Sequence, residues 1–297
     1  MPLRRCSSWL RTPCTAPVNH YRTDPIKRLS SCSTKNYLGG NVELEGKIVV
    51  VTGGASGIGR EMCRRFAREG AKKIIVADLD AAGAEAVAAE VEGVAMAVDV
   101  RDETQIVNLI ETTENGVGPI DLFCSNAGIG IGKDIDTPDD VWQTIWEVNT
   151  MAHVWAARAL VPRMVARGGG YLLNTSSAAG LLSQIGSVTY AVTKHAAVAL
   201  AEWLSITYGD RGIKVSVLCP QAVRTAMTAG GAGVAAVDGM IEPEAAVEAV
   251  VETLRDERFL VLPHPEVAEY IKRKTSDYDR WLTGMRRLQT QYTSADG

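Results

Sequence analysis

The segment that most restricts how this chain can fold is a short apolar run that leads directly into a glycine-rich turn. Residues 48–51 read Ile-Val-Val-Val, as in a buried strand, and residues 52–59 follow with the spacing G-x-x-x-G-x-G. A helical pattern begins at once. Glycines permit a tight turn and let the backbone approach a pyrophosphate, which the helix N-terminus can bind. In this strand–turn–helix context we expect dinucleotide phosphates at Gly53, Ser56, Gly57, Ile58 and Gly59.

Beyond this turn, short β-branched runs alternate with longer Ala-rich helical stretches. Strands are predicted at 47–52, 73–78, 95–100, 120–125, 170–175, 213–219 and 259–262. Helices are predicted at 57–69, 80–91, 102–115, 139–167, 190–210 and 243–256. Continuous apolar strands suit a parallel sheet buried on both faces, and the alternation implies right-handed crossovers. We therefore predict one α/β domain over residues 46–262: a doubly wound, Rossmann-type, mostly parallel seven-stranded sheet with helices on both faces.

The two ends of the chain differ from this domain. Residues 1–40 hold seven basic residues and one acid, without a steady period, so residues 1–45 are interpreted as a poorly ordered basic leader. An organelle transit peptide and upstream sequence outside the functional domain are the alternatives. Residues 263–297 contain a charged helical pattern around 266–288. We expect this tail to pack on the domain or on a neighbouring subunit; a lid over the substrate is the weaker alternative.

Charge and cysteine usage restrict the partners. Without residues 1–40 the chain has 24 basic and 34 acidic residues, a net charge of −10. It therefore lacks the broad positive field that attracts nucleic acid or anionic lipid, and no run of about 18 apolar residues predicts a membrane span. The six cysteines form no C-x-x-C pair and the four histidines are scattered, so we expect reduced thiols, a cytoplasmic location and no metal. Among the possible ligands, these features favour a small-molecule substrate.

Polar residues at the predicted strand ends extend the dinucleotide hypothesis. Asp78 ends the second strand, 19 residues after Gly59. A carboxylate there accepts hydrogen bonds from ribose hydroxyls and repels a 2′-phosphate, which favours NAD over NADP; capping the next helix is the alternative role. Because ligands bind at the carboxyl ends of parallel strands, further contacts are expected from the residues that close the third and fourth strands. These residues are Asp99, Val100, Asn126, Ala127 and Gly128.

A second set of residues suggests proton chemistry. Tyr190 and Lys194 stand four residues apart near a helix start, so they share a helical face, and the ammonium is expected to pull the tyrosine pKa below about 10. Such a tyrosine passes a proton to or from a substrate oxygen. Ser177 follows the fifth strand and supplies a hydroxyl for that oxygen. Asn149 is a poor mid-helix residue, which predicts either a helix distortion that binds a water near Lys194 or a plain solvent-facing side chain.

Taken in order, these motifs resemble the short-chain dehydrogenases/reductases, in the non-extended branch, over roughly residues 46–262. The resemblance implies that Tyr190 is the acid/base, that Lys194 binds the nicotinamide ribose and lowers the tyrosine pKa, and that Ser177 orients the substrate oxygen. It further implies a proton relay through Asn149 and an adenine contact from Asp99. Val223 and Thr225 are implied to contact the nicotinamide carboxamide. Relatives commonly form homotetramers or homodimers through the two long helices, here 139–167 and 190–210.

Two departures from the family pattern stand out. Ser125 replaces the first Asn of the usual Asn-Asn-Ala-Gly, a mild change inside the sheet. Gln221 replaces the Gly that usually follows Pro220, and Gln accepts a positive φ only at a cost. We therefore expect the loop to take a different path, which affects the contacts of Val223 and Thr225, and Gln221 to reach the substrate.

Three segments are expected to form the substrate pocket: 129–135, 178–189 and 222–240. They supply many apolar residues and a few polar ones, among them Gln184, which suits a hydrophobic secondary alcohol or ketone. The Ala- and Gly-rich stretch 226–240 is expected to be mobile and to close over the substrate. The expected activity is hydride transfer between NAD(H) and that substrate. An epimerase or dehydratase on the same scaffold, and a non-catalytic NAD-binding regulator, are the alternatives.

Overall fold

A computed structural model describes residues 43–293, so the predicted leader lies outside the described residues except for its last three positions. The strands are β1 (Ile48–Thr52), β2 (Lys73–Asp78), β3 (Val94–Ala97), β4 (Leu122–Ser125), β5 (Gly170–Thr175), β6 (Ile213–Leu218) and β7 (Leu260–Val261). The α-helices are α1 (Gly57–Arg68), α2 (Ala81–Glu90), α3 (Glu103–Gly116), α4 (Asp139–Trp146), α5 (Ala152–Ala166), α6 (Ala179–Leu182), α7 (Val188–Tyr208), α8 (Pro243–Arg255), α9 (Glu266–Ser276) and α10 (Tyr278–Thr293). The remaining helical segments are η2 (Glu147–Met151), η3 (Gly209–Arg211), η4 (Ala226–Thr228) and η5 (Gly233–Ala236).

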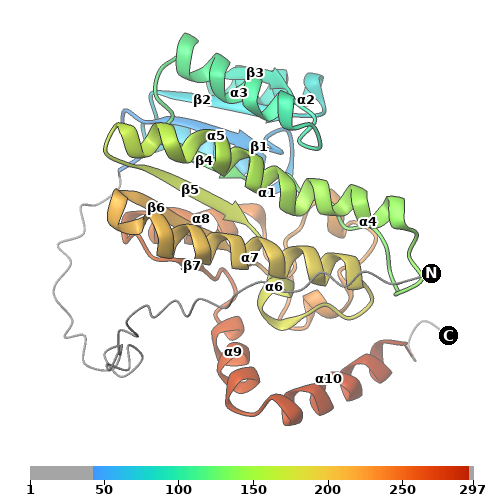
Figure 1. Cartoon of the computed structure of the whole chain (residues 1–297). Coiled ribbons are helices and arrows are strands. Elements are labelled where there is room, and N and C mark those ends of the chain that lie inside the picture. The colour runs from blue at the N-terminus through green and yellow to red at the C-terminus, as the bar shows by residue number, and fades with distance from the viewer. Residues whose placement is uncertain (1–42, 294–297) are drawn as a thin grey trace, which may run out of the picture. The chain divides into compact units, whose positions relative to one another are not determined.

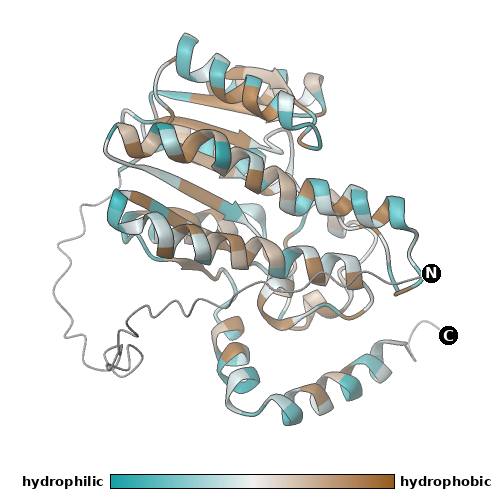
Figure 2. Ribbon diagram, in the orientation of Figure 1, coloured by the Kyte–Doolittle hydropathy of each residue, from teal (hydrophilic) through white to brown (hydrophobic). Residues whose placement is uncertain are grey.

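All seven strands form one parallel sheet in the order β3-β2-β1-β4-β5-β6-β7, which confirms the predicted doubly wound fold. Helices cover both faces (Figure 1). Successive residues of a strand point to opposite faces, and β1 follows this rule: Val50 packs with α3, α5 and α7, whereas Val49 and Val51 pack with α1, α2 and α8. In Figure 2 the strands are mostly brown, whereas the helices alternate between teal, white and brown.

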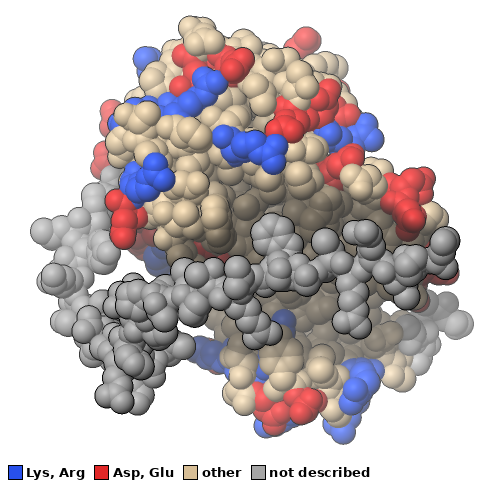
Figure 3. Space-filling model, viewed as in Figure 1, with Lys and Arg blue, Asp and Glu red and all other residues tan. Residues whose placement is uncertain are grey.

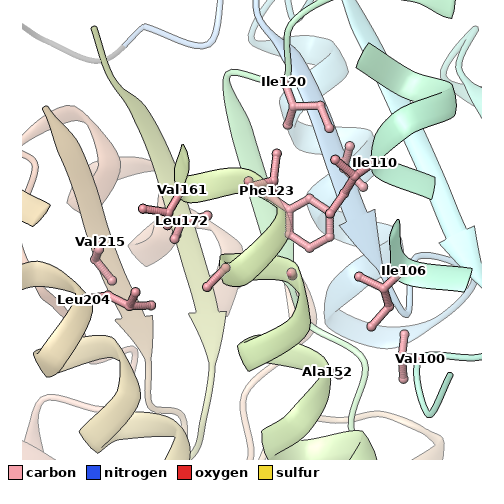
Figure 4. Close-up of a cluster of buried hydrophobic side chains, with 14 of the residues drawn as sticks. Val100, Ile106, Ile110, Ile120, Phe123, Ala152, Val161, Leu172, Leu204 and Val215 are labelled. Carbon is pink, nitrogen blue, oxygen red and sulfur yellow. The ribbon is translucent and has the colours of Figure 1, made fainter. Parts of the chain in front are cut away.

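The core on the α3, α5 and α7 face holds the sheet against these helices. Figure 4 shows the ring of Phe123 from β4 lying beside Ile110 of α3, with Leu172 of β5 and Val161 of α5 nearby. Phe123 is 1% exposed. Truncating such a side chain to alanine typically costs about 3–5 kcal/mol, so packing on this face contributes strongly to the stability of the fold.

Three differences from the predicted elements bear on the site. β3 ends at Ala97, so Asp99 and Val100 lie in the loop after it. The long helix predicted at 139–167 contains a π-helical turn, η2, between α4 and α5. The short helix α6 was not predicted, because four residues are too few to show a period.

The predicted C-terminal helix is two helices that form an arm (Figure 1). Asp277 is extended, with φ −156° and ψ 95°, which ends α9; its carboxylate then accepts a hydrogen bond of 2.9 Å from the backbone N–H of Arg280 in the first turn of α10. α9 buries Val267 against Ala178 and Leu182 of the α6 region. The arm therefore packs on the domain at the side where β5 and β6 end.

Candidate active site

The strand order reverses between β1 and β4, so the connections that leave their carboxyl ends lead to helices on opposite faces of the sheet. Open α/β sheets bind ligands at such a switch point. Thr52, the last residue of β1, links the two strands: its hydroxyl accepts hydrogen bonds from the backbone N–H groups of Asn126, at 2.9 Å, and Ala127, at 3.2 Å. The amide of Asn126 donates back to the Thr52 carbonyl at 3.1 Å. The glycine turn and the segment after β4 thus form one unit.

Steric crowding explains the last glycine of the turn. A Cβ on Gly59 would lie 2.0 Å from the Gly53 carbonyl oxygen and 2.6 Å from the Asn126 amide nitrogen. Gly57 has a φ of +54°, and a Cβ there would lie 3.0 Å from the Thr225 methyl group. The structure therefore brings together three predicted segments: the glycine turn, the residues after β4 and the loop after β6.

The N-terminus of α1 suits an anion. Ser56 is the N-cap residue, yet its hydroxyl makes no capping hydrogen bond, and the first turn holds no acidic residue. The first N–H groups of a helix have no partner within the helix and carry the positive end of its dipole. An uncapped, acid-free terminus beside glycines that leave no room for side chains fits a dinucleotide pyrophosphate.

Asp78 is held beside the glycine turn. One carboxylate oxygen accepts a hydrogen bond of 3.0 Å from the backbone N–H of Ala55, and the other accepts one of 3.0 Å from Asp80. Asp80, not Asp78, caps α2 by accepting from Gly83. The capping alternative for Asp78 is therefore wrong, and its negative charge is fixed next to the turn.

The other predicted cofactor residues lie along the same edge with different surroundings. The carboxylate of Asp99 is paired with the guanidinium of Arg101 at 2.6 Å, which lowers the pKa of Asp99. Val100 packs its side chain into the core beside Ile106 (Figure 4), so little of it is exposed for a cofactor contact. A Cβ on Gly128 would lie 3.3 Å from the Lys194 ammonium, so this glycine permits close contact with the candidate catalytic residues.

Asn149 lies in the π-helical turn η2 and is fully buried, which confirms the predicted helix distortion and excludes the solvent-facing alternative. Its amide oxygen accepts a hydrogen bond of 2.9 Å from the Ile129 N–H, and its amide nitrogen donates to the Ile129 carbonyl at 2.9 Å. π-helical turns inside α-helices are frequent at functional sites. Here the π-helical turn directs the side-chain amide of Asn149 toward the loop that follows β4.

Lys194 and Tyr190 are neighbours on α7, as their spacing predicts. The Lys194 ammonium donates a hydrogen bond of 3.0 Å to the Thr175 carbonyl and lies 5.6 Å from the centre of the Tyr190 ring. Ser177 lies across from them: its hydroxyl donates to the Pro220 carbonyl at 3.3 Å and accepts from the Ala179 N–H at 3.1 Å. The structure therefore gathers Ser177, Tyr190 and Lys194 at the end of β5.

The electrostatics of this group correct one prediction. Burial raises the pKa of Tyr190 above its ordinary value of 10, and a hydrogen bond from Ser177 acts in the opposite direction without cancelling the effect. The expected lowering by Lys194 is not found. Burial also lowers the pKa of Lys194 to about 8, so the ammonium is itself only moderately favoured. The four-residue spacing of Tyr190 and Lys194 does not show that both side chains are desolvated. Desolvation opposes charge on the tyrosine and on the lysine.

The loop after β6 does not need a glycine. Gln221 has no positive φ, and its backbone N–H donates to the His264 ring at 3.2 Å. The predicted strain at Gln221 is therefore absent, and Thr225 still contacts the glycine turn. The side-chain amide of Gln221 donates to the Asp238 carboxylate at 2.9 Å, while its amide oxygen is buried without a hydrogen-bond partner among the described residues.

A cavity of about 640 Å³ lies beside Ser177. Gln184 and Gln221 line it, with residues from η5, α9 and α10. Of the three segments expected to form it, 129–135 does not line it, and its place is taken by the C-terminal arm, with Tyr270 and Trp281. Ile129 instead packs against the core. A helical period shows that the tail has an apolar side, but not which part of the protein that side meets.

Two hydrogen bonds to Asp238 connect three segments that surround this cavity. The Asp238 carboxylate accepts hydrogen bonds from the Gln221 amide, at 2.9 Å, and from the Tyr270 hydroxyl, at 2.8 Å. The loop that carries η5 is thereby tied to the end of β6 and to α9. Nothing in the sequence pattern indicates this three-residue latch, because its members are 17 and 32 residues apart.

Three further features of residues 43–293 concern membrane spans, metal ligands and surface charge. No helix there has the length and apolarity to cross a membrane, and no three His, Cys, Asp or Glu side chains gather as metal ligands. On the face shown in Figure 3, basic and acidic side chains of the described residues are interspersed. The described chain shows no broad basic patch on that face.

Comparison with known proteins agrees with this geometry. The family model described as short chain dehydrogenase matches residues 47–255. The chain is 34% identical over 256 residues to 1-deoxy-11-beta-hydroxypentalenate dehydrogenase of Streptomyces exfoliatus (82% of this chain, 92% of the relative) and 32% identical over 232 residues to human epidermal retinol dehydrogenase 2 (73% and 74%). A crystal structure of a short chain dehydrogenase/reductase from Burkholderia phymatum in complex with NAD superimposes with a TM-score of 0.73 at 26% identity, covering 80% of this chain and 95% of that one.

Proposed function

Because the chain belongs to the short-chain dehydrogenase/reductase family, we propose that it interconverts a hydrophobic secondary alcohol and its ketone with NAD(H). The observation that carries this proposal is that Tyr190 contacts both Lys194 and Ser177, and that Ser177 also lines a largely apolar cavity. The family binds NAD(H), and the Burkholderia relative holds NAD. The named relatives act as dehydrogenases, one of them of a retinol.

The residues that would hold the cofactor lie along the carboxyl edge of the sheet. The N–H groups at the start of α1 would bind the pyrophosphate, and Asp78 would accept hydrogen bonds from the adenosine ribose. We assign the nicotinamide end to Lys194, Thr225 and the backbone near Gly128, since Lys194 lies at the Tyr190 ring, Gly128 beside the Lys194 ammonium and Thr225 beside Gly57 of the glycine turn. The fixed charge of Asp78 opposes a 2′-phosphate, so NAD is the preferred form. When bound, NAD(H) supplies or accepts the hydride.

Proton transfer falls to Tyr190. Its raised pKa keeps the phenol protonated near neutral pH, so it gives a proton to the substrate oxygen during ketone reduction and must lose one before it accepts a proton during alcohol oxidation. Ser177 positions that oxygen by hydrogen bonding. Below a pH of about 8 Lys194 is a cation, since its pKa is about 8, and we assign to this ammonium the binding of the nicotinamide ribose hydroxyls.

The role assigned to Asn149 is in proton transfer and not in substrate binding. Its amide bridges the backbone of Ile129 at both the N–H and the carbonyl, which fixes the loop beside Gly128. Its nitrogen also lies 3.3 Å from the Thr193 hydroxyl on α7. We assign to Asn149 the positioning of a relay water that reprotonates Tyr190 through Lys194.

The long helices are proposed as the contact between copies in a homodimer or homotetramer. α7 exposes Val192, Trp203 and Ile206 by 44%, 55% and 84%. Exposed apolar side chains along one helix are typical of an interface core.

The direct test is an absorbance assay for NADH with a panel of hydrophobic secondary alcohols and ketones, run with NAD(H) and NADP(H). We expect turnover with NAD(H) and a weaker rate with NADP(H). NADH binding without turnover of any alcohol or ketone would favour a non-catalytic regulator, and redox-neutral conversion of a sugar-like substrate would favour an epimerase or dehydratase.

A further inference from the structure

We propose that the substrate carries an anionic group, such as a carboxylate, that binds Arg273 and Arg280 while its hydroxyl or carbonyl lies at Ser177. The inference rests on the proposed function, because it concerns the same cavity, and it narrows the substrate from a hydrophobic alcohol to an amphipathic anion. Arg273 comes from the last turn of α9 and Arg280 from the first turn of α10.

The first observation is the charge of the cavity wall. Among the described residues that line it, Arg273 and Arg280 are the only charged ones, and none is acidic. The other lining residues are apolar or neutral, including Leu182, Trp281 and Leu288. Both arginines are exposed to solvent, so their attraction for an anion is partly screened, but no acidic residue among the lining residues opposes it.

The second observation concerns the acidic groups near these guanidiniums, of which Glu269 interacts with Arg273 through charge alone. Within residues 43–293 neither forms an ion pair, although the neighbouring Lys272 pairs with Glu269 at 2.5 Å. The guanidinium of Arg273 lies 5.7 Å from the centre of the Tyr270 ring, and this cation–π contact holds it at the cavity. The planar fork of each guanidinium therefore remains available for bidentate recognition of a carboxylate or a similar oxyanion.

The third observation is that the arm which carries both arginines is tied to the wall that carries Ser177. The ammonium of Lys274 donates a hydrogen bond of 2.6 Å to the Leu181 carbonyl of α6, and the Tyr270 hydroxyl donates to Asp238. Ser177 lies immediately before the α6 region and lines the same cavity. One ligand can therefore reach both the charged end and the reacting end.

The test uses a matched pair of secondary alcohols, 6-(1-hydroxyethyl)-2-naphthoate and its methyl ester. Both arginines are exposed at the mouth of the cavity, so we expect a moderate preference: kcat/KM with NAD⁺ about tenfold higher for the carboxylate. The double variant Arg273→Gln/Arg280→Gln should lose this preference, so that its kcat/KM values for the carboxylate and the ester become equal.

The matched control is Arg286→Gln/Arg287→Gln, which removes the same charge from α10 at positions that do not line the cavity. It should keep the preference for the carboxylate. A wild-type enzyme that oxidises both alcohols equally well would overturn the inference while leaving the proposed function in place. So would a preference that persists in the Arg273→Gln/Arg280→Gln variant.

If neither alcohol is oxidised, the result counts against the proposed function. A binding measurement then tests the anionic-substrate inference separately. Calorimetric titration of the NADH-loaded protein with each naphthalene compound then decides the inference. Tighter binding of the carboxylate by wild type, lost in Arg273→Gln/Arg280→Gln, supports it. Equal affinity for carboxylate and ester, or no binding of either, overturns it.

Discussion

The cofactor end and the substrate end of the site are built in different ways. At the cofactor end, the site is formed mainly by backbone atoms and glycines. The Gly53 carbonyl lies so close to Gly59 that no side chain fits there. At the substrate end, side chains from α6, the Asp238 loop and the C-terminal arm surround an open cavity. Backbone sites tolerate little change, whereas side-chain walls can be altered singly. The same fold can therefore keep one cofactor and vary its substrate.

The largest expected contrast comes from adding one methyl group at each end. Gly59→Ala places a Cβ 2.0 Å from the Gly53 carbonyl, so the turn must open, and we expect NADH affinity to fall at least about a hundredfold. Gly284→Ala in α10 meets no atom within 4 Å and should leave NADH binding unchanged. Fluorescence titration with NADH measures both, and thermal melting reports whether each variant is folded. Equal NADH affinity in the two variants would break the comparison.

A charge change at the cofactor end should have a smaller effect. Asp78→Asn keeps a hydrogen-bond acceptor for Ala55 but removes the charge that opposes a 2′-phosphate, so the NAD-to-NADP ratio of kcat/KM should fall about tenfold. Asp80→Asn, two residues away on the cap of α2, is the control and should keep the ratio. If wild type already uses NAD and NADP equally, the role given to Asp78 is wrong.

At the substrate end, breaking the latch should change substrate binding alone. Asp238→Ala removes the acceptor shared by Gln221 and Tyr270, so the loop loses its tie to α9 and KM for a ketone substrate should rise about threefold to tenfold. The dissociation constant of NADH should not change. Asp256→Ala, which removes an exposed aspartate paired with Arg258, is the control. A parallel loss of NADH affinity in Asp238→Ala would show that the two ends are not separable.

The glycine turn and the carboxylate beside it could be predicted from the sequence because their determinants are local. Glycine spacing after a strand and a carboxylate at the next strand end both follow from the order of residues along the chain. The helix distortion at Asn149 is likewise local. The arm could not be placed, because Arg273, Arg280 and Trp281 reach the cavity only through the break at Asp277 and the packing of Val267 on α6. The pKa of Tyr190 was missed because desolvation is a property of the folded core.

A further prediction concerns stability beneath the site. Burial, with a smaller contribution from Lys194, lowers the pKa of His153 to about 3. The unfolded chain binds a proton at this histidine below about pH 6.5 and the folded chain does not, so stability should fall as pH drops from 6.5 toward 3, by up to about 1.4 kcal/mol per pH unit. Urea unfolding of wild type and His153→Leu at pH 7 and pH 5 tests this. The variant should lose less stability on acidification; an equal loss would contradict the assignment.

The central claim is that Tyr190 transfers the proton next to a bound cofactor, and Tyr190→Phe tests it most directly. Removal of a general acid or base typically costs about 10²–10⁴ in rate, so we predict a kcat loss in that range for ketone reduction, with the NADH dissociation constant unchanged. Tyr208→Phe, at the far end of the same helix, should keep full activity. A Tyr190→Phe enzyme that turns over at the wild-type rate would contradict the account.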